Sequence, residues 1–159
     1  MKISAQEEYG LRCLVQLANL PAGGTLTLPH IAELEGISTA NAGKLMWLLN
    51  KAGFVQSTRG TKGGYFLARP ADEIRLSEII KVLDEDVMNK HCDSYTGVLD
   101  SCVHNGDCGI RPVIIGLHEI VENALSRITL AQLVGNESSV DAMFHQIKGI
   151  HRTIEPQGI

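Results

Sequence analysis

The chain has 159 residues, of which 44% are hydrophobic and 4% aromatic, and its formal net charge is −4. This length suits one domain with an appendage, and the few aromatic residues imply a mainly aliphatic core. Charged residues within the first twenty positions, and the lack of an uncharged apolar run of roughly 20 residues, disfavour a signal peptide and a membrane span. We therefore expect a cytoplasmic protein without membrane contact, in which clustered cysteines favour metal binding or redox chemistry over structural disulfides.

Charge is distributed unevenly along the chain. No Asp or Glu occurs between Gly36 and Ala71, although the chain holds 18 acidic residues. The cations of this segment are Lys44, Lys51, Arg59, Lys62 and Arg69. Because a phosphate backbone responds to local charge, a basic patch on an acidic protein predicts double-stranded DNA as the partner. A chance gap in the acidic residues is the alternative.

Three helices are predicted in the first third of the chain. An amphipathic helix over residues 5–20 is followed by the helix-breaking sequence PAGG. Thr27, followed by an early proline and later by a glycine, predicts the cap of a short second helix. Ser38 or Thr39 then caps a third helix over about 39–52, whose predicted buried stripe is Ala42, Leu45, Leu48, Leu49 and Ala52. The last two helices and their short connection are typical of a helix-turn-helix.

The periodicity then changes to that of β-strands. Two short β-prone runs, residues 54–58 and 65–68, flank the turn-rich RGTKGG and predict a hairpin. A further short helix within residues 72–86 turns these side chains inward: Ile74, Leu76, Ile79, Ile80 and Leu83. The predicted fold is mainly α with a small β-hairpin wing: a winged helix-turn-helix DNA-binding domain over residues 1–88, followed by a long C-terminal dimerisation helix.

The third helix and the wing supply the candidate DNA contacts. With its stripe buried, the third helix turns small and basic side chains outward, so that its backbone can approach the floor of a major groove. The glycine-rich tip of the wing can place a cation in a narrow minor groove. The candidate contacts are Thr39, Ala40, Asn41, Gly43, Lys44, Lys51, Arg59, Gly60 and Lys62. Trp47 shares the outward face, where it either contacts DNA or packs against the wing or another helix.

Three of the four cysteines lie in HCDSYTGVLDSCVHNGDC, within an expected ligand loop over residues 89–109. Thiolates bind iron–sulfur clusters, while structural zinc with a histidine, or metal-free thiols that form a disulfide, are the alternatives. An electron carrier would use the same cysteines, but no catalytic set or phosphate-binding loop accompanies them, so we expect no enzyme. The fourth cysteine, Cys13, falls on the apolar stripe of the first helix and is predicted to lie in the core.

A long helix after the cysteine loop is predicted to join two copies of the chain. Pro112 lies near its start, and a dimerisation helix is expected over residues 110–135. Its apolar stripe, which can extend to Val134, is Val113, Leu117, Ile120, Val121, Ala124, Leu125 and Ile128. A sustained stripe of this kind often pairs with its own copy, and packing on the same domain is the alternative. The tail, residues 136–159, is expected to be partly helical.

Three stretches resemble the winged-helix iron–sulfur regulators that include IscR and NsrR. They are the start MKISAQEEYGLRCLVQLA, the wing AGFVQSTRGTKGGYFLARP with EIRLSEIIKVLD after it, and the late cysteine cluster before a long helix. The resemblance covers roughly residues 1–135. It implies a homodimeric transcription factor, usually a repressor, that binds a palindromic operator in double-stranded DNA. It also implies a [2Fe–2S] or [4Fe–4S] cluster that senses redox state, nitric oxide or the supply of iron and clusters.

The same resemblance implies a set of cluster ligands. The family's cysteines map onto Cys92, Cys102 and Cys108, with a first gap longer than in IscR-like or NsrR-like members. IscR-like proteins add a histidine after the third cysteine, where this chain has CGIRP. NsrR-like members instead imply Glu8 of the partner subunit, and Arg12 stands where some relatives have a further histidine. Three thiolates and one oxygen ligand favour [4Fe–4S] over [2Fe–2S]. The reserve ligands are His104, His91 and Glu7.

Overall fold

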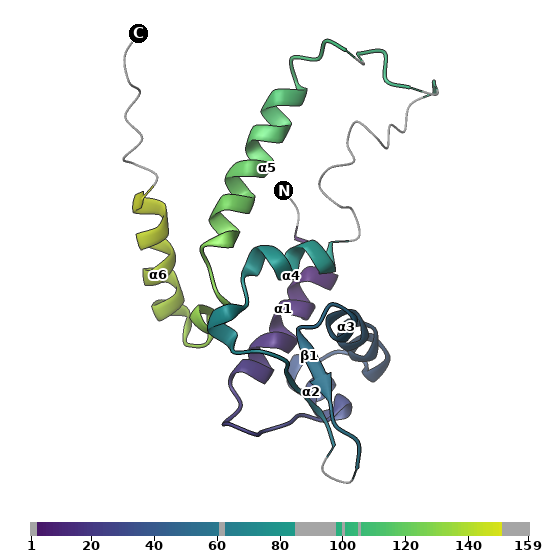
Figure 1. Ribbon diagram of the computed structural model, residues 1–159, viewed down its shortest axis with the longest axis vertical. Helices are drawn as coiled ribbons and strands as arrows, with labels where there is room; N and C mark the ends of the chain where they lie inside the picture. Colours follow the sequence, from purple (N-terminus) through teal and green to yellow (C-terminus); the bar gives the residue numbers. More distant parts are fainter. Residues whose placement is uncertain (1–2, 61–62, 85–97, 100, 105, 151–159) are drawn as a thin grey trace.

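The structure is a computed structural model that describes residues 3–60, 63–84, 98–99, 101–104 and 106–150, with side chains described as far as Gln146. Four helices and a two-stranded hairpin form a winged-helix body, from which a long helix and a C-terminal helix extend (Figure 1). This arrangement confirms the predicted fold class.

Helix α1, Ala5–Ala18, runs through the middle of the body. Its first turn is closed by a reciprocal capping box: the Glu7 N–H donates to Ser4 Oγ at 3.2 Å, and the Ser4 N–H donates to Glu7 Oε2 at 2.6 Å. The helix ends at its cap, Asn19, slightly earlier than predicted. Its buried face carries Gly10, Cys13, Leu14 and Leu17.

Helices α2, Leu28–Glu35, and α3, Thr39–Lys51, pack together as the predicted helix-turn-helix. The Thr27 side chain accepts a hydrogen bond from the His30 N–H, and the Ser38 side chain accepts one from the Asn41 N–H at 3.1 Å. Gly36 ends α2 with φ of 64°, in the left-handed region that favours glycine. These local signals were readable in the sequence, and both caps form as predicted.

The buried stripe of α3 differs from the predicted one. Ala42, Leu45 and Leu49 are buried as predicted, Leu48 is only half-buried, and Ala52 is exposed because the helix ends at Lys51. Met46, which was left out of the predicted stripe, is fully buried in the core. The wider stripe arises because α3 packs against α1 and α4 as well as against α2.

Strands β1, Val55–Ser57, and β2, Tyr65–Leu67, form the antiparallel wing. The register pairs Gln56 with Phe66, and Leu26 adds an isolated bridge to Tyr65 on the other side of β2. Glycine is required at position 64, since a Cβ there would lie 2.6 Å from the Leu26 carbonyl oxygen. The hairpin is thereby joined to the loop after α1.

After the wing come η1 (Ala71–Glu73) and α4 (Leu76–Leu83), which packs on α1, and α5 (Arg111–Ser126) follows the cysteine loop. The predicted extension of α5 to Val134 is wrong, because the helix ends at Ser126. Residues 128–130 instead pair with the start of α4: the Leu76 N–H donates to the Ile128 carbonyl, and the Leu130 N–H to the Ile74 carbonyl, both at 2.9 Å. The short η2 (Leu130–Leu133) and α6 (Glu137–Ile150) complete the described chain.

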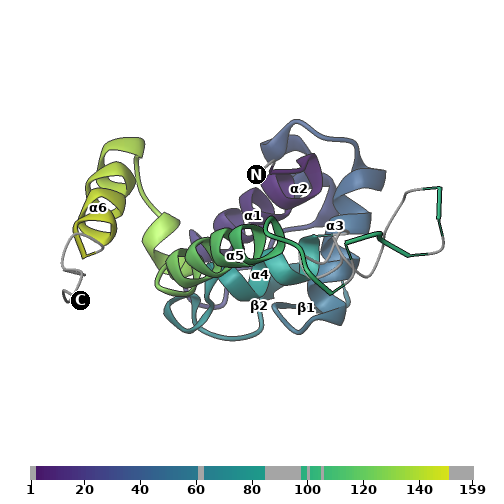
Figure 2. The ribbon, with the colours of Figure 1, turned by 90° about the horizontal axis from the view of Figure 1, so that it is seen from above.

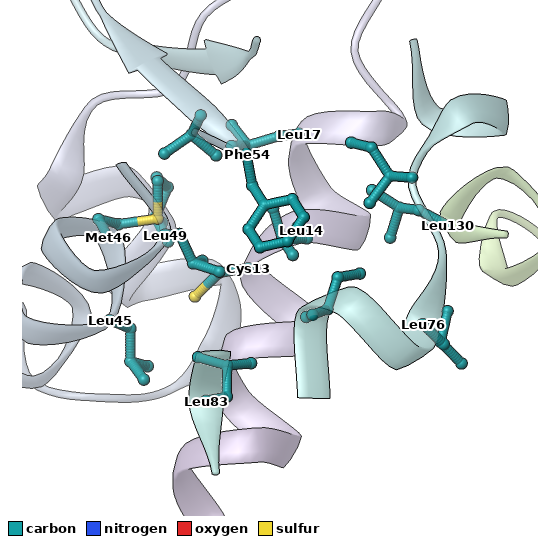
Figure 3. Close-up of a cluster of buried hydrophobic side chains, with 14 of the residues drawn as sticks. Cys13, Leu14, Leu17, Leu45, Met46, Leu49, Phe54, Leu76, Leu83 and Leu130 are labelled. Carbon is teal, nitrogen blue, oxygen red and sulfur yellow. The ribbon is translucent and has the colours of Figure 1, made fainter. Parts of the chain in front are cut away.

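One hydrophobic cluster lies under these elements (Figure 3). Side chains from α1, α3, β1, α4 and the 128–130 segment meet in it, and Leu14, Met46, Leu83 and Leu130 are fully buried. The core is aliphatic and contains one phenylalanine, Phe54, in line with the low aromatic content. None of the described helices is long and apolar enough to span a bilayer.

Candidate DNA-binding surface and cysteine loop

The outward face of α3 carries the predicted combination of small and basic side chains. Ala40, Lys44, Trp47 and Lys51 are exposed, and Gly43 is half-buried. Thr39 and Asn41 are exposed in the first turn, where the helix dipole favours an anionic group such as a phosphate. Since α3 contains no acidic residue, nothing on the helix itself opposes this attraction.

The tip of the wing presents Arg59 and Gly60 to solvent, while Lys62 lies outside the described residues. Gly60 has φ of 116°, which only glycine adopts easily, and the Gly63 N–H donates to its carbonyl at 2.8 Å. A Cβ at Gly63 would lie 2.4 Å from the Thr58 carbonyl oxygen. The glycines therefore make a tight loop that holds the Arg59 side chain outside the body.

Arg69, the last cation of the acid-free segment, points back to the protein instead. Its guanidinium pairs with Glu78, donates to the Glu73 carbonyl at 3.0 Å, and lies over the Phe54 ring at 5.6 Å from the centroid. Its charge is thus used to hold the end of the wing against α4. The surface available to DNA therefore has fewer cations than the number of lysines and arginines between Gly36 and Ala71 implies.

Two of the three loop cysteines are described. Cys102 and Cys108 are free thiols and half-buried, and the Cys108 carbonyl accepts from the Arg111 N–H at 3.2 Å where α5 begins. His104 is exposed. Cys92 and the reserve ligand His91 lie outside the described residues. Within the residues that the structure describes, no group of three or more His, Cys, Asp or Glu side chains lies close enough to hold a metal ion.

The two acidic residues at the start of α1 have different surroundings. Glu7 is buried and its carboxylate is engaged in the capping box, so the helix start already uses this reserve ligand. Glu8 is exposed, and its Oε1 accepts from Arg12 Nη2 at 2.6 Å. Arg12 also lies over the Tyr9 ring. Glu8 borders an open recess whose apolar lining comes from Ile3, Leu11, Val15, Leu34 and Leu133.

Cys13 is separate from the loop cysteines, as predicted. It is fully buried, and this burial, assisted by the negative charge of Glu35, raises the pKa of its thiol to about 12. A thiol held in its protonated form inside the core is a poor metal ligand, so Cys13 acts as a small hydrophobic residue.

The predicted apolar stripe of α5 is divided between two directions. Val121 and Leu125 are half-buried, and Leu125 packs against the core of the body. Val113, Leu117 and Ile120 remain exposed at 60%, 59% and 58%. The N-terminal part of α5 projects beyond the body (Figure 1), and seen from above α5 lies in front of α1 and α4 (Figure 2). The helix therefore packs on its own domain with one side and leaves a second apolar side uncovered.

The comparisons with known proteins agree with this arrangement. A family model named Rrf2, described as an iron-dependent transcriptional regulator, matches residues 3–136. The chain belongs to the Rrf2 family. It is 30% identical to the HTH-type transcriptional regulator IscR of Pectobacterium carotovorum over 96% of this chain and 91% of that protein. It is 29% identical to IscR of Cronobacter sakazakii over 99% and 94% of the two chains.

Solved structures of Rrf2-type proteins have the same fold. T. potens IscR is 28% identical and superimposes with a TM-score of 0.63 over 99% of this chain and 94% of that one. CymR of B. subtilis, titled the global cysteine regulator, is 30% identical with a TM-score of 0.65 over 84% and 96%. The oxidised form of Staphylococcus aureus CymR is 29% identical with a TM-score of 0.67 over 86% and 98%.

Family membership confirms the resemblance found in the sequence. The chain is a transcriptional regulator, and its α2–α3 pair and hairpin are a DNA-binding winged helix; its named relatives are regulators and not enzymes. The 128–130 segment was missed in the sequence. A signal for it was present, since Ile128 and Leu130 alternate with Arg127 and Thr129 in the period of a strand.

Proposed function

We propose that the chain is a homodimeric repressor whose affinity for a palindromic DNA operator depends on an iron–sulfur cluster. Cys92, Cys102 and Cys108 would hold the cluster together with the partner subunit's Glu8. The observation that carries the proposal is the position of Cys102 and Cys108: these two free, partly accessible thiols lie in the segment before α5, the helix with an uncovered apolar side.

The described donors fit an iron–sulfur cluster. Thiolates are the usual protein ligands of such clusters, and neither Cys102 nor Cys108 is used in a disulfide. Glu8 is exposed, while Glu7 is held in the capping box, so Glu8 is the carboxylate that can reach another chain. Three thiolates with one carboxylate favour [4Fe–4S] over [2Fe–2S]. When bound, a cluster supplies a centre that responds to oxidants, nitric oxide and iron supply.

Contacts of α5 provide a route from the cysteine loop to the DNA. Lys81 on α4 pairs with Glu122 on α5 at 2.8 Å, and the 128–130 segment is hydrogen-bonded to the start of α4. Helix α4 in turn packs against α1 and α3. A shift of α5 within a dimer would therefore move the two α3 helices, whose spacing must match half-sites about one DNA turn apart.

The DNA contacts of this proposal are residues of α3 and the wing: Thr39, Ala40, Asn41, Gly43, Lys44, Lys51, Arg59, Gly60 and Lys62. Each lysine or arginine that neutralises a phosphate contributes to a salt-dependent affinity. Binding to promoter DNA should thus weaken steeply as salt is raised.

The cluster is tested by purifying the full chain without oxygen and measuring iron, sulfide and zinc, with Mössbauer spectra to identify the cluster type. We expect a brown protein containing iron and sulfide. Each of the single substitutions Cys92→Ser, Cys102→Ser and Cys108→Ser should abolish the colour. Cys13→Ala, which changes a buried cysteine outside the loop, should retain it. A colourless protein that contains zinc, and neither iron nor sulfide, would rule out the cluster.

The role of Glu8 is tested with two neighbouring substitutions of equal size. Glu8→Gln removes the anionic ligand and should change the absorption spectrum and speed cluster loss. Glu7→Gln keeps the capping box, because glutamine at this position also accepts from the Ser4 N–H. Identical spectra for Glu8→Gln and the unmodified protein would remove Glu8 from the ligand set.

A second candidate is a winged-helix regulator that responds to zinc or thiol oxidation without a cluster. The observation in its favour is the likeness to CymR, one of whose structures is of an oxidised form, together with the accessible thiols. Hydrogen peroxide would join two thiols as a disulfide and be reduced to water. A metal-free protein whose DNA affinity changes reversibly with peroxide and dithiothreitol would favour this candidate. A protein that carries electrons but does not bind DNA would contradict both the cluster-dependent repressor and the cluster-free regulator.

A further inference from the structure

Trp47 is the one tryptophan of the chain, and the structure leaves it in solvent on the DNA-facing side of α3. Its side chain is 59% exposed, although Leu45, Met46 and Leu49 of the same helix are almost completely buried. Trp47 therefore does not pack into the core or beneath the wing. The sequence had left packing and DNA contact as alternatives for this residue. A large indole in this position exposes apolar surface that a binding partner can cover.

Trp47 is held in place by a cation and has an open surface next to it. The Lys51 ammonium lies 5.1 Å from the ring centroid, one helical turn further along α3. One turn before it, a Cβ at Gly43 would meet only the Leu28 side chain, at 3.6 Å. The small residues Ala40 and Gly43 therefore let the helix backbone come close to a partner, and the indole stands beside that approach.

The charge around Trp47 identifies the partner as duplex DNA and not another protein. Of the exposed large apolar side chains in the described part of the chain, Trp47 is the one on α3, whereas α5 gathers several into a stripe suited to a protein partner. On α3, the exposed Lys44 and Lys51 lie one turn before and one turn after Trp47, and no acidic residue occurs between Gly36 and Ala71. A single aromatic side chain flanked by lysines is suited to the major groove of DNA. The 5-methyl group of thymine is the apolar group that a protein can contact there.

We infer that Trp47 is a specificity-determining residue that packs its indole against the 5-methyl group of a thymine in each half-site. Lys51, oriented over the ring, binds a neighbouring phosphate. The inference rests on DNA binding through α3, which family membership supports, and is independent of the cluster and of the identity of its ligands.

The first test uses selection from a pool of duplexes with a randomised central region, read by sequencing. The full-length protein, purified without oxygen, should select a motif with a fixed thymine that Trp47→Ala loses and Trp47→Phe partly keeps. Lys44→Ala is the control one turn before Trp47: it should weaken binding to all sequences and lower the salt dependence, with the thymine preference unchanged. Identical motifs for Trp47→Ala and the unmodified protein would overturn the inference.

The second test removes the methyl group alone. In the selected duplex, deoxyuridine replaces the preferred thymidine, and affinity of the unmodified protein should fall roughly fivefold, within the range for one altered base pair. The Trp47→Ala variant should bind both duplexes equally. Since Trp47 is the only tryptophan, its fluorescence should also change on binding the thymidine duplex, and less on the deoxyuridine duplex.

These outcomes separate the inference from the proposed function. If the unmodified protein selects no sequence and shows no salt-dependent binding in either the cluster-loaded or metal-free form, DNA binding itself fails and the inference falls with it. If the protein binds a defined motif but the methyl group makes no difference, only the role of Trp47 is wrong. A uniform loss of affinity in Trp47→Ala, with the motif retained, likewise contradicts a specificity role.

Discussion

Gly10 sets how closely α1 and α4 approach. A Cβ at this position would lie 2.5 Å from Cδ1 of Leu83, and Leu83 is itself fully buried in the core. Because the buried Leu83 side chain would have to shift within the core, Gly10→Ala should lower the free energy of unfolding by about 1–2 kcal/mol, despite the better helix propensity of alanine. Urea denaturation measures this change.

A second helical glycine provides the control. A Cβ at Gly43 would make ordinary contact with Leu28 at 3.6 Å, so Gly43→Ala should raise the free energy of unfolding by up to about 1 kcal/mol. Equal effects of the two substitutions would show that the contact with Leu83 does not limit the packing of α1.

The cysteines should differ in reactivity according to their burial. Burial raises the pKa of Cys13 from its ordinary value of 9.0 to about 12, so at pH 8 its reactive thiolate is almost absent in the folded protein. In metal-free, reduced protein, N-ethylmaleimide should label Cys102 and Cys108 and leave Cys13 unmodified until denaturant is added. Peptide mass spectrometry reads this out, and labelling of all three at one rate would contradict the burial of Cys13.

Among the elements, the 128–130 segment connects the C-terminal part of the chain to the winged helix. Leu130 is fully buried in the core, and its N–H donates to the Ile74 carbonyl. Leu130→Ala should therefore cost about 2–5 kcal/mol of unfolding free energy, as much as a core substitution within α1 or α3. Leu133→Ala, three residues on and half-buried, should cost clearly less. A small effect at Leu130 would mean that the segment is not part of the folding unit.

At the scale of the whole molecule, the uncovered side of α5 predicts the assembly. Val113, Leu117 and Ile120 align on a helix that leaves its own body, so a second copy is the partner that we propose for them. Ile120→Asp should convert the dimer to a monomer in analytical ultracentrifugation, because it places a charge in an apolar interface. DNA affinity should fall as well, while the far-UV circular dichroism spectrum should be unchanged.

The same helix offers a matched control for this prediction. Ile115 is also exposed, but the helical period places it on the other side of α5 from the stripe. Ile115→Asp makes the same chemical change and should leave the dimer intact. Dissociation by Ile115→Asp, with Ile120→Asp still dimeric, would place the interface elsewhere.

Local signals made most of the winged helix predictable. Caps such as Thr27 and Ser38, the glycine at the end of α2, and the period-two runs around RGTKGG each act within a few residues, so the sequence states them directly. The three-cysteine spacing predicts a ligand loop through its resemblance to known regulators, and this loop stays a prediction. The length of α5 was not predictable in this way, because an apolar stripe that continues to Val134 does not show which side chains leave the helix to join a distant core.

Sequence alone determined the order of the elements, the acid-free segment between Gly36 and Ala71 and the separation of Cys13 from the loop cysteines, since each depends on residue type and short-range spacing. Tertiary structure decided where the longer-range contacts fall. It turned Arg69 back onto Glu78, placed Glu7 in a cap and left Glu8 outside, and bent the chain after Ser126 to bury Ile128 and Leu130. It also left Trp47 in solvent. The physical reason is that burial depends on which surfaces meet across the fold, and segments far apart in the sequence create those surfaces together.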